Sequence, residues 1–189
     1  MIIAKAKLSS EALYQQGKYV QVEKKARETH KDYEERTWRE RCHYTPEDEG
    51  VYIPAIAFKK CLESSARFNS RQIPGKGKQT YTKHFVSGVA VLQDVPLPIT
   101  KSTIIPDRQF VPSDGKSGGG KRVEKIFPTV HNWEGEVQFI INDHTITEDV
   151  FTDVLEDAGK FIGIGVWRPE NSGMNGRFSV DSVDWQELD

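Results

Sequence analysis

Alternating apolar and polar side chains predict two amphipathic β-strands in this chain. In residues 2–8 apolar side chains occupy one face, and lysines lie between them. The same period of two runs through residues 133–141, where glutamates and a glutamine occupy the opposite face. Nearly continuous apolar runs predict buried strands at residues 85–92 and 161–167, and a final strand is expected around residues 178–183.

Two other segments repeat apolar residues at helical spacing. The first helix begins at Pro54, since proline suits the first helical turn, and its buried face continues to Ala66. The second follows a capping-box sequence at residues 145–148 and ends before Gly159. Residues 20–41 are also helix-prone, but their apolar content is too low for a deeply buried helix.

The predicted elements follow the order strand, helix, strand, strand, helix, strand, with one extra strand at the C-terminal end. This is the βαββαβ order of the ferredoxin-like fold, which is of the α+β class. We expect a single domain over residues 1–189 with long insertions at about residues 9–50, 69–84 and 93–129. In the last insertion, four prolines before Lys116 and a run of glycines after it predict a hairpin whose mobile tip lies at residues 114–120.

Three features of the chain resemble one protein family. Residues 51–59, VYIPAIAFK, look like the I-P-x-x-x-x-K sequence that leads into its first helix, and residues 163–178 resemble its glycine-rich loop. The insertion at residues 93–129 sits where some of its members carry a thumb-like hairpin. The family is the repeat-associated mysterious protein (RAMP) superfamily, which includes the backbone subunits of CRISPR effector complexes. The resemblance implies an RRM-like ferredoxin fold that holds RNA.

Most of residues 20–180 also resembles a group of short, mostly uncharacterised bacteriophage proteins. The similarity is clearest in residues 75–78, GKGK, and in the pattern GIGxWRP…GRF within residues 163–178. It implies that the protein is phage-encoded, and it implies no settled activity.

Composition restricts the class of protein further. Apolar residues make up 37% and charged residues 29% of the chain, which is typical of a soluble protein with a polar surface. No apolar run approaches the roughly 20 residues that span a bilayer, so we expect no membrane partner. With only two cysteines in the chain, we expect a reduced, cytoplasmic protein. The two cysteines, Cys42 and Cys61, form neither a disulfide framework nor a metal-binding pair, and the five histidines lack zinc-site spacing. We therefore expect structural thiols, no metal and no cofactor.

The formal net charge of −2 hides an uneven distribution along the chain. Residues 59–83 carry seven Lys or Arg and a single acid, and residues 101–125 carry six Lys or Arg and three acids. Residues 134–189 carry thirteen Asp or Glu and only three Lys or Arg. The sequence therefore predicts a basic surface suited to phosphates and an acidic surface suited to a neighbouring protein.

Residues 58–85 contain both ingredients of a single-stranded nucleic-acid site, cations for phosphates and aromatic faces for bases. Gly75 and Gly77 would let backbone amides approach a phosphate. Lys59 is the strongest single candidate, because a cation in the first turn of a helix opposes the helix dipole and an anionic partner would explain it. The candidates here are Lys59, Lys60, Arg67, Arg71, Lys76, Lys78, Tyr81 and Lys83, with Phe68 and Phe85 as further aromatics. The alternative, a solvated basic loop and helix surface, stays open.

Two further basic groups are candidates for the same interface. They are Arg168 and Arg177 in the glycine-rich loop, and Lys116, Lys121, Arg122 and Lys125 on the predicted hairpin. The alternatives are salt bridges within the acidic third for the arginines and a flexible solvated loop for the hairpin cations. Trp133 and Trp167 fall on strand patterns, so we expect both in the core.

The leading hypothesis is a non-enzymatic protein that binds single-stranded nucleic acid, RNA or DNA, and assembles as a homo-oligomer or filament. Its acidic C-terminal third would meet the basic middle of the next copy head to tail. A second hypothesis is a phage factor that engages or mimics a subunit of a host defence complex through its acidic surface. A third is a small metal-independent endoribonuclease that uses His84, near the basic loop, as a base, although the sequence positions no second catalytic group.

Overall fold

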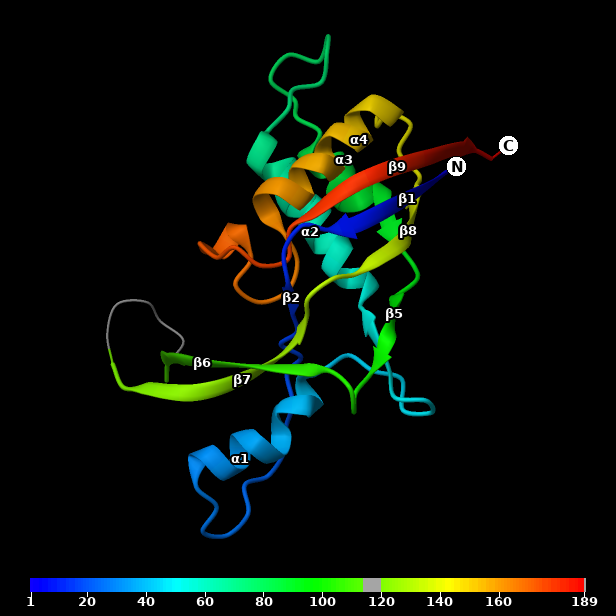
Figure 1. The fold of residues 1–189 in the computed structure, drawn as a ribbon. Helices are drawn as coiled ribbons and strands as arrows, with labels where there is room; N and C mark the ends of the chain where they lie inside the picture. Colours follow the sequence, from blue (N-terminus) through cyan, green and yellow to red (C-terminus); the bar gives the residue numbers. More distant parts are fainter. Residues whose placement is uncertain (114–119, 189) are drawn as a thin grey trace.

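The computed structural model describes residues 1–113 and 120–188 (Figure 1). Its largest sheet has four antiparallel strands in the order β4-β8-β1-β9. These strands are β1 (Ile2–Ser10), β4 (Val89–Val91), β8 (Glu134–Ile141) and β9 (Phe178–Glu187). Two helices, α2 (Ala55–Asn69) and α4 (Glu148–Asp157), pack on one face of this sheet. The chain order β1-α2-β4-β8-α4-β9 confirms the expected α+β, ferredoxin-like βαββαβ fold.

The amphipathic strands build the core as their sequence pattern predicts. Ala4 and Ala6 on β1 are fully buried, and Phe139 on β8 pairs with Ala4 across the sheet. The ring centroid of Phe139 lies 5.1 Å from that of Phe151 on α4, and Phe151 also contacts Trp185 on β9 at 5.7 Å. The two central strands and α4 therefore share one apolar interior, whose burial drives folding.

The expected strand over residues 161–167 is wrong, and this changes the place of the C-terminal strand. Ala158–Ile162 forms a π-helical turn, η2, and the chain then bends through Gly163 and Gly165, whose φ angles are +72° and +78°. These left-handed angles suit glycine and cannot continue a strand. β9 is therefore the fourth strand of the βαββαβ unit and not an extra strand.

Residues 85–92 also differ from the expectation, because a helix occupies their first half. This helix, α3 (Thr82–Gly88), precedes the short strand β4. The helical spacing of Tyr81 and Phe85 places both rings in the core, where the residues are 5% and 0% exposed. The same apolar residues are thus buried, but on a helix and not on a strand.

The insertion at residues 93–129 contains the expected hairpin. Its strands, β6 (Ile105–Pro112) and β7 (Arg122–Val130), project from the body of the molecule in Figure 1, and β7 also pairs with the short strand β2 (Tyr14–Gln15). Before them, β5 (Val95–Thr100) pairs with β3 (Gly50–Ile53). Of the expected mobile tip, residues 114–119 lie outside the described residues.

A second insertion covers one side of this hairpin. Within residues 20–41 the helical parts are α1 (His30–Thr37) and the 3₁₀ helix η1 (Trp38–Arg41). The Arg41 guanidinium donates to Glu34 at 2.7 and 2.8 Å and to the carbonyl oxygen of Ile126 on β7 at 2.9 Å. Burial alone would raise the pKa of Glu34, but the Arg41 guanidinium outweighs it and holds that pKa below its usual range. This ion pair therefore fastens the insertion to the hairpin.

Both cysteines are free and buried. Burial raises the pKa of the Cys42 thiol to about 12 and also raises that of Cys61.

No described helix is long and apolar enough to cross a membrane. In the same part of the chain, no three His, Cys, Asp or Glu side chains gather as they would around a metal ion.

Candidate nucleic-acid interface

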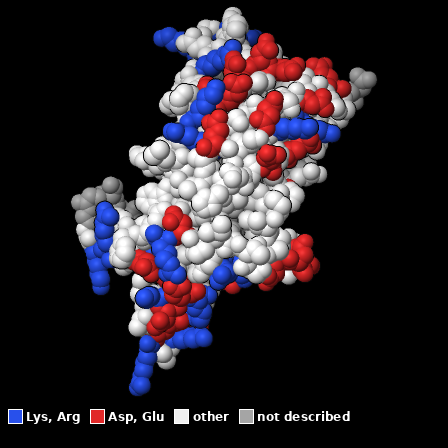
Figure 2. Space-filling model, viewed as in Figure 1, with Lys and Arg blue, Asp and Glu red and all other residues white. Residues whose placement is uncertain are grey.

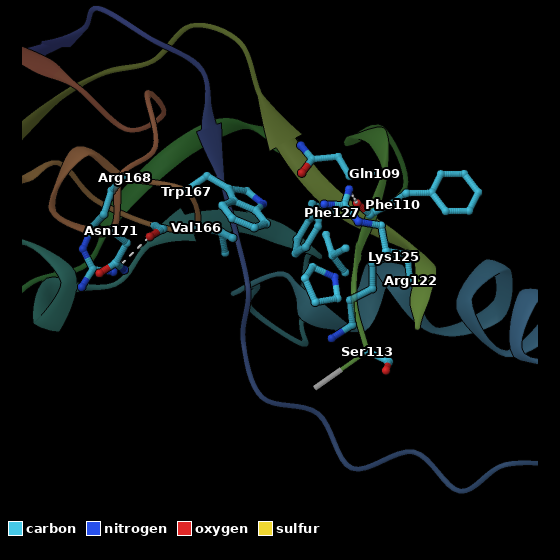
Figure 3. Close-up of a pocket in the computed structure, with 13 residues that line it drawn as sticks. Gln109, Phe110, Ser113, Arg122, Lys125, Phe127, Val166, Trp167, Arg168 and Asn171 are labelled. Carbon is cyan, nitrogen blue, oxygen red and sulfur yellow. Dashed lines mark hydrogen bonds between the residues drawn. The ribbon is translucent and has the colours of Figure 1, made fainter. Parts of the chain in front are cut away.

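A groove of about 810 Å³ lies between the β6–β7 hairpin and residues 163–177, a segment called the glycine turn below (Figure 3). The hairpin side includes Gln109, Arg122, Lys125 and Phe127, and the turn side includes Val166, Trp167, Arg168 and Asn171. A short 3₁₀ helix, η3 (Pro169–Asn171), forms part of the turn side. The groove therefore joins the hairpin to the glycine-rich loop, two candidate segments that lie far apart in the sequence.

Glycines allow the glycine turn to pack closely on the N-terminal segment. A Cβ atom on Gly165, whose φ is +78°, would overlap with the carbonyl oxygen of Gln15. Backbone hydrogen bonds join the same segments, among them those from Val166 N to Gln15 O at 3.0 Å and from Gly176 N to Leu13 O at 2.8 Å. The close approach fixes the shape of the turn and thus the position of the side chains that it carries.

Trp167 is the aromatic side chain that the glycine turn presents to the groove. Its φ of +59° is in the left-handed region, which bulky residues rarely adopt, and its carbonyl oxygen accepts from Asn175 N at 3.0 Å. Trp167 is 38% exposed, so its expected core position is wrong, whereas Trp133 is buried as expected. Figure 3 shows the Trp167 side chain directed across the groove toward Phe127. An exposed aromatic residue on strained backbone is typical of a functional site.

Three cations border the groove beside these rings. Arg168 donates to the Glu170 carboxylate at 2.7 and 2.9 Å and to the carbonyl oxygen of Gly165 at 3.2 Å, so part of its charge is neutralised. Arg122 donates to a backbone carbonyl of β6 at 3.4 Å, and Lys125 forms no ion pair with a described residue. The groove therefore combines an exposed aromatic face with positive charge, the two features of a single-stranded nucleic-acid site.

The structure brings only some of the candidates on these two segments to the groove. Arg122 and Arg168 line it, Lys121 is exposed beside Arg122, and Lys116 lies outside the described residues. Arg177 belongs to the glycine turn but does not line the groove, and its buried Nε atom has no hydrogen-bond partner among the described residues. Sequence reasoning missed Trp167, although two glycines spaced two residues apart just before it are a signal against a strand.

The cations on α2 are engaged in structural contacts. Lys59 is 14% exposed, and its ammonium donates to the carbonyl oxygens of Phe85 and Val86 at 2.7 and 2.9 Å, where α3 ends. Its Nζ atom also lies 3.2 Å from Glu63. Glu63 pairs in addition with Lys60 and Arg67, and Arg71 pairs with Asp153 on α4. The geometry therefore explains the Lys59 cation by the C-terminus of α3, without an anionic ligand.

The basic loop, defined here as residues 71–80, is at the other end of the molecule from the hairpin (Figure 1). Lys76 and Lys78 are exposed, and Gly75 and Gly77 have φ angles of +74° and +63°. Lys83, on α3 beside it, is also exposed. This loop does not share the groove with Arg122 and Arg168.

The aromatic residues around the basic loop are less accessible than expected for stacking. Tyr81 and Phe85 are buried, so their rings belong to the core and cannot receive a base. Phe68 is 63% exposed and stacks on Phe161, with ring centroids 5.5 Å apart. Of the three aromatics interleaved with these cations, only Phe68 therefore faces solvent.

His84 is held in a geometry that does not present it to a substrate. Its Nδ1 atom lies 2.6 Å from the Asp143 carboxylate, and its Nε2 atom is buried without a hydrogen-bond partner in the described structure. Burial alone would raise the pKa of Asp143, but hydrogen bonds from His84 and Thr145 hold it below its usual range. A general base needs a nitrogen that reaches the substrate, and the free nitrogen here is enclosed.

The sheet face opposite the helices is also unsuited to stacking. In RRM domains aromatic side chains on this face stack on RNA bases. Here Lys5 on β1 lies between Gln138 and Asp184, and Lys7 lies opposite Glu136. The face therefore carries cross-strand polar pairs, which leaves the groove as the better candidate for base stacking.

Comparisons with known proteins give a structural match only. No protein-family model matches the chain, and no curated protein matches it in sequence. A chain in the cryo-EM structure of the type III-B Cmr-beta bound to cognate target RNA matches 97% of this chain with a TM-score of 0.56 and 12% identity. This protein spans 60% of that chain's length. Cmr6 from Pyrococcus furiosus is matched with a TM-score of 0.46 and 15% identity, over 95% of this chain and 99% of that one. The Cmr-beta match shows that the two chains share a fold.

Proposed function

We propose that this protein binds single-stranded RNA in the groove between the β6–β7 hairpin and the glycine turn, and that it does so without a chemical step. The observation that carries the proposal is the exposed Trp167 ring, held on strained backbone across the groove from the hairpin and bordered by Lys125 and Arg122. The Cmr-beta chain of similar fold occurs in a complex with target RNA, which favours RNA over DNA.

The chemistry of the groove divides between bases and backbone. Stacking of a base on an aromatic ring contributes about 1–3 kcal/mol and tolerates any base. Arg122, Lys125 and Arg168 would neutralise phosphates, and displacement of about three counterions gives a slope of about −2 for log affinity against log salt. We therefore expect affinity that falls with salt and a strand that covers the indole of Trp167.

Tryptophan fluorescence tests the site directly, because Trp38 and Trp133 are each only 3% exposed and Trp167 is the most exposed tryptophan. Adding an RNA of about twelve nucleotides should quench the emission, and Trp167→Phe should remove most of the quenching. Trp167→Ala should weaken binding by about tenfold or more in fluorescence anisotropy. Tyr19→Ala, which removes an aromatic residue that is 86% exposed outside the groove, is the matched control. Undiminished quenching in Trp167→Phe, or no binding at micromolar protein and low salt, would contradict the proposal.

We also propose that copies associate head to tail through the basic loop. Lys76 and Lys78 are exposed and form no ion pair with a described residue, although backbone hydrogen bonds from Ile73 N to Gln79 O and from Tyr81 N to Arg71 O order their loop. Acidic side chains gather over the upper part of the molecule in Figure 2, where α4 and β9 lie. The basic loop lies beside α4, where Arg71 pairs with Asp153. The loop of one copy would therefore meet the acidic surface of the next, and complementary charge would set the register of that contact.

Sedimentation measures this association separately from binding. Lys76→Glu with Lys78→Glu should lower the mass of the assemblies, while Arg122→Glu with Lys125→Glu should weaken RNA binding and leave assembly of the free protein unchanged. Lys5→Glu with Lys7→Glu on the sheet face is the control for charge alone. A protein that stays monomeric with and without RNA would refute the proposed contact.

Catalysis through His84 has no support in this geometry, since its free nitrogen is enclosed. Single-stranded RNA incubated with the protein should therefore stay intact. Cleavage that disappears in His84→Ala would support the ribonuclease hypothesis instead.

A further inference from the structure

A chain of side-chain hydrogen bonds joins the two walls of the groove. Gln109 on β6 donates from Nε2 to Asp107 Oδ2 at 2.6 Å, and Gln15 on β2 donates from its Nε2 to the same oxygen at 2.5 Å. Gln15 in turn accepts at Oε1 from Asn175 Nδ2 at 2.9 Å, and Asn175 belongs to the glycine turn. The Asp107 carboxylate therefore connects the hydrogen bonds of the hairpin wall to those that reach the glycine turn.

Asp107 determines which atom donates and which accepts in each of these hydrogen bonds. An ionised carboxylate only accepts hydrogen bonds, so each glutamine must turn its NH₂ group toward it. The amide oxygen of Gln15 is thereby directed to Asn175, and the amide oxygen of Gln109 is directed away from Asp107. Figure 3 shows the Gln109 side chain reaching from the hairpin toward the Trp167 side of the groove.

The opposite amide orientations are costly here. Gln15 is fully buried, and reversing its amide would set an oxygen against Asp107 and an NH₂ group against the Asn175 amide. Reversing the Gln109 amide would likewise set its oxygen against the carboxylate at 2.6 Å. No described residue donates to Gln109 Oε1, so the groove offers a fixed hydrogen-bond acceptor beside its aromatic ring.

We propose that Gln109 reads the stacked base and that Asp107 positions it to do so. The inference rests on the proposed function, and it names the preference of the same groove. A fixed acceptor can receive a hydrogen bond from an exocyclic amino group on the Watson–Crick edge, as in cytosine or adenine. Uracil has a donor on that edge, its ring N3–H, but this donor lies between two carbonyl oxygens. An acceptor placed to receive the amino group of cytosine therefore meets the O4 oxygen of uracil, and two acceptors repel. The groove therefore prefers cytosine and adenine to uracil.

Cytosine against uracil is the cleaner comparison, because both are pyrimidines and stack over a similar area. Anisotropy with oligocytidine and oligouridine of equal length should show about three- to tenfold tighter binding of oligocytidine, the range for one neutral hydrogen bond. Gln109→Met removes the acceptor at similar side-chain length. It should bring the ratio of the affinities for oligocytidine and oligouridine close to one. Asp107→Asn keeps an oxygen that can accept but lets the amides reverse, so it should lower the ratio and largely keep the affinity. Asp184→Asn, on the remote strand β9, should leave the ratio unchanged.

The outcomes separate this inference from the proposed function. Equal affinity of the unaltered protein for both oligomers overturns the base preference and leaves RNA binding standing. A ratio that survives Gln109→Met overturns the role of Gln109, and a ratio that survives Asp107→Asn overturns the positioning role of Asp107. Failure to bind either oligomer at low salt overturns both proposals.

Discussion

Replacing Lys59 by methionine is expected to lower stability and to leave RNA binding unchanged. The ammonium donates to two carbonyl oxygens, of Phe85 and Val86, in the last turn of α3, where carbonyls lack helical partners. Lys59 is only 14% exposed, so water replaces the lost donor poorly. A hydrogen bond to a charged group contributes about 1.5–3 kcal/mol, and methionine keeps most of the apolar stem. We therefore expect a loss of about 2 kcal/mol in the free energy of unfolding.

Lys60 provides the matched control for this substitution. Its ammonium lies 3.0 Å from the same Glu63 carboxylate, but Lys60 is 65% exposed. The Lys60 ammonium is largely solvated, and the buried Glu63 carboxylate keeps Lys59 and Arg67 as partners, so Lys60→Met should cost less than about 1 kcal/mol. In Lys59→Met the Glu63 carboxylate keeps Lys60 and Arg67 as partners, so the expected loss reports on the α3 carbonyls.

Urea denaturation followed by tryptophan fluorescence measures both free energies. For a chain of this length a loss of about 2 kcal/mol corresponds to a Tm lower by about 4–8 °C. RNA affinity, measured by anisotropy at fixed salt, should stay within about twofold for both variants, since neither lysine lines the groove. A tenfold loss of affinity in Lys59→Met at unchanged stability would refute this reasoning and return Lys59 to the interface.

Three further predictions concern other parts of the molecule. Gly165→Ala should cost about 2 kcal/mol or more and weaken RNA binding, because its Cβ overlaps with backbone at positive φ, whereas Gly75→Ala, at a similar φ with open space, should cost only about 1 kcal/mol in the same melts. The folded-state pKa of Glu34 lies below its unfolded value, so its ion pair stabilises the protein above about pH 4.5 and loses this contribution as pH falls through the folded pKa. In Glu34→Gln the free energy of unfolding should therefore fall less steeply as the pH is lowered below about 4.5. Both thiols should resist a disulfide reagent at neutral pH until the protein unfolds, since burial raises their pKa values, and rapid labelling of the folded protein would contradict this.

Period-two and helical patterns predict the elements that bury a single face. Residues 2–8 and 133–141 form the paired strands β1 and β8. Their register is well determined, because a shift of one residue would expose every apolar side chain to solvent. The apolar stripes of α2 and α4 identify the helices that cover them. Residues 161–167 fail for a different reason: their apolar content is as high as that of a strand, and their backbone angles follow from packing against a distant segment.

The candidate site is less predictable than the fold, because a cationic residue type does not reveal its partner. Lys59 and Arg71 satisfy groups within the protein, a helix end and an aspartate on α4. Arg122 and Arg168, of the same residue types, line the groove. What separates the two pairs is which elements lie beside them, and that depends on contacts between residues far apart in sequence.

One such contact explains why a groove exists at all. The two-residue strand β2 pairs with the base of β7, and the carbonyl oxygen of Gln15 also accepts from Val166 N in the glycine turn. The side chain of Gln15 repeats the connection through Asp107 on β6 and Asn175 in the turn. Both walls are thus fixed to the same residue by backbone and side chain alike, and the width of the groove is set where they meet. A fully buried glutamine is costly unless its amide is satisfied, so Asp107 and Asn175, which satisfy it from the two walls, would together resist a change in that width. The groove should therefore bind its strand as a preformed site, and substitutions at β2 should alter the stacking of RNA on Trp167 without touching RNA themselves.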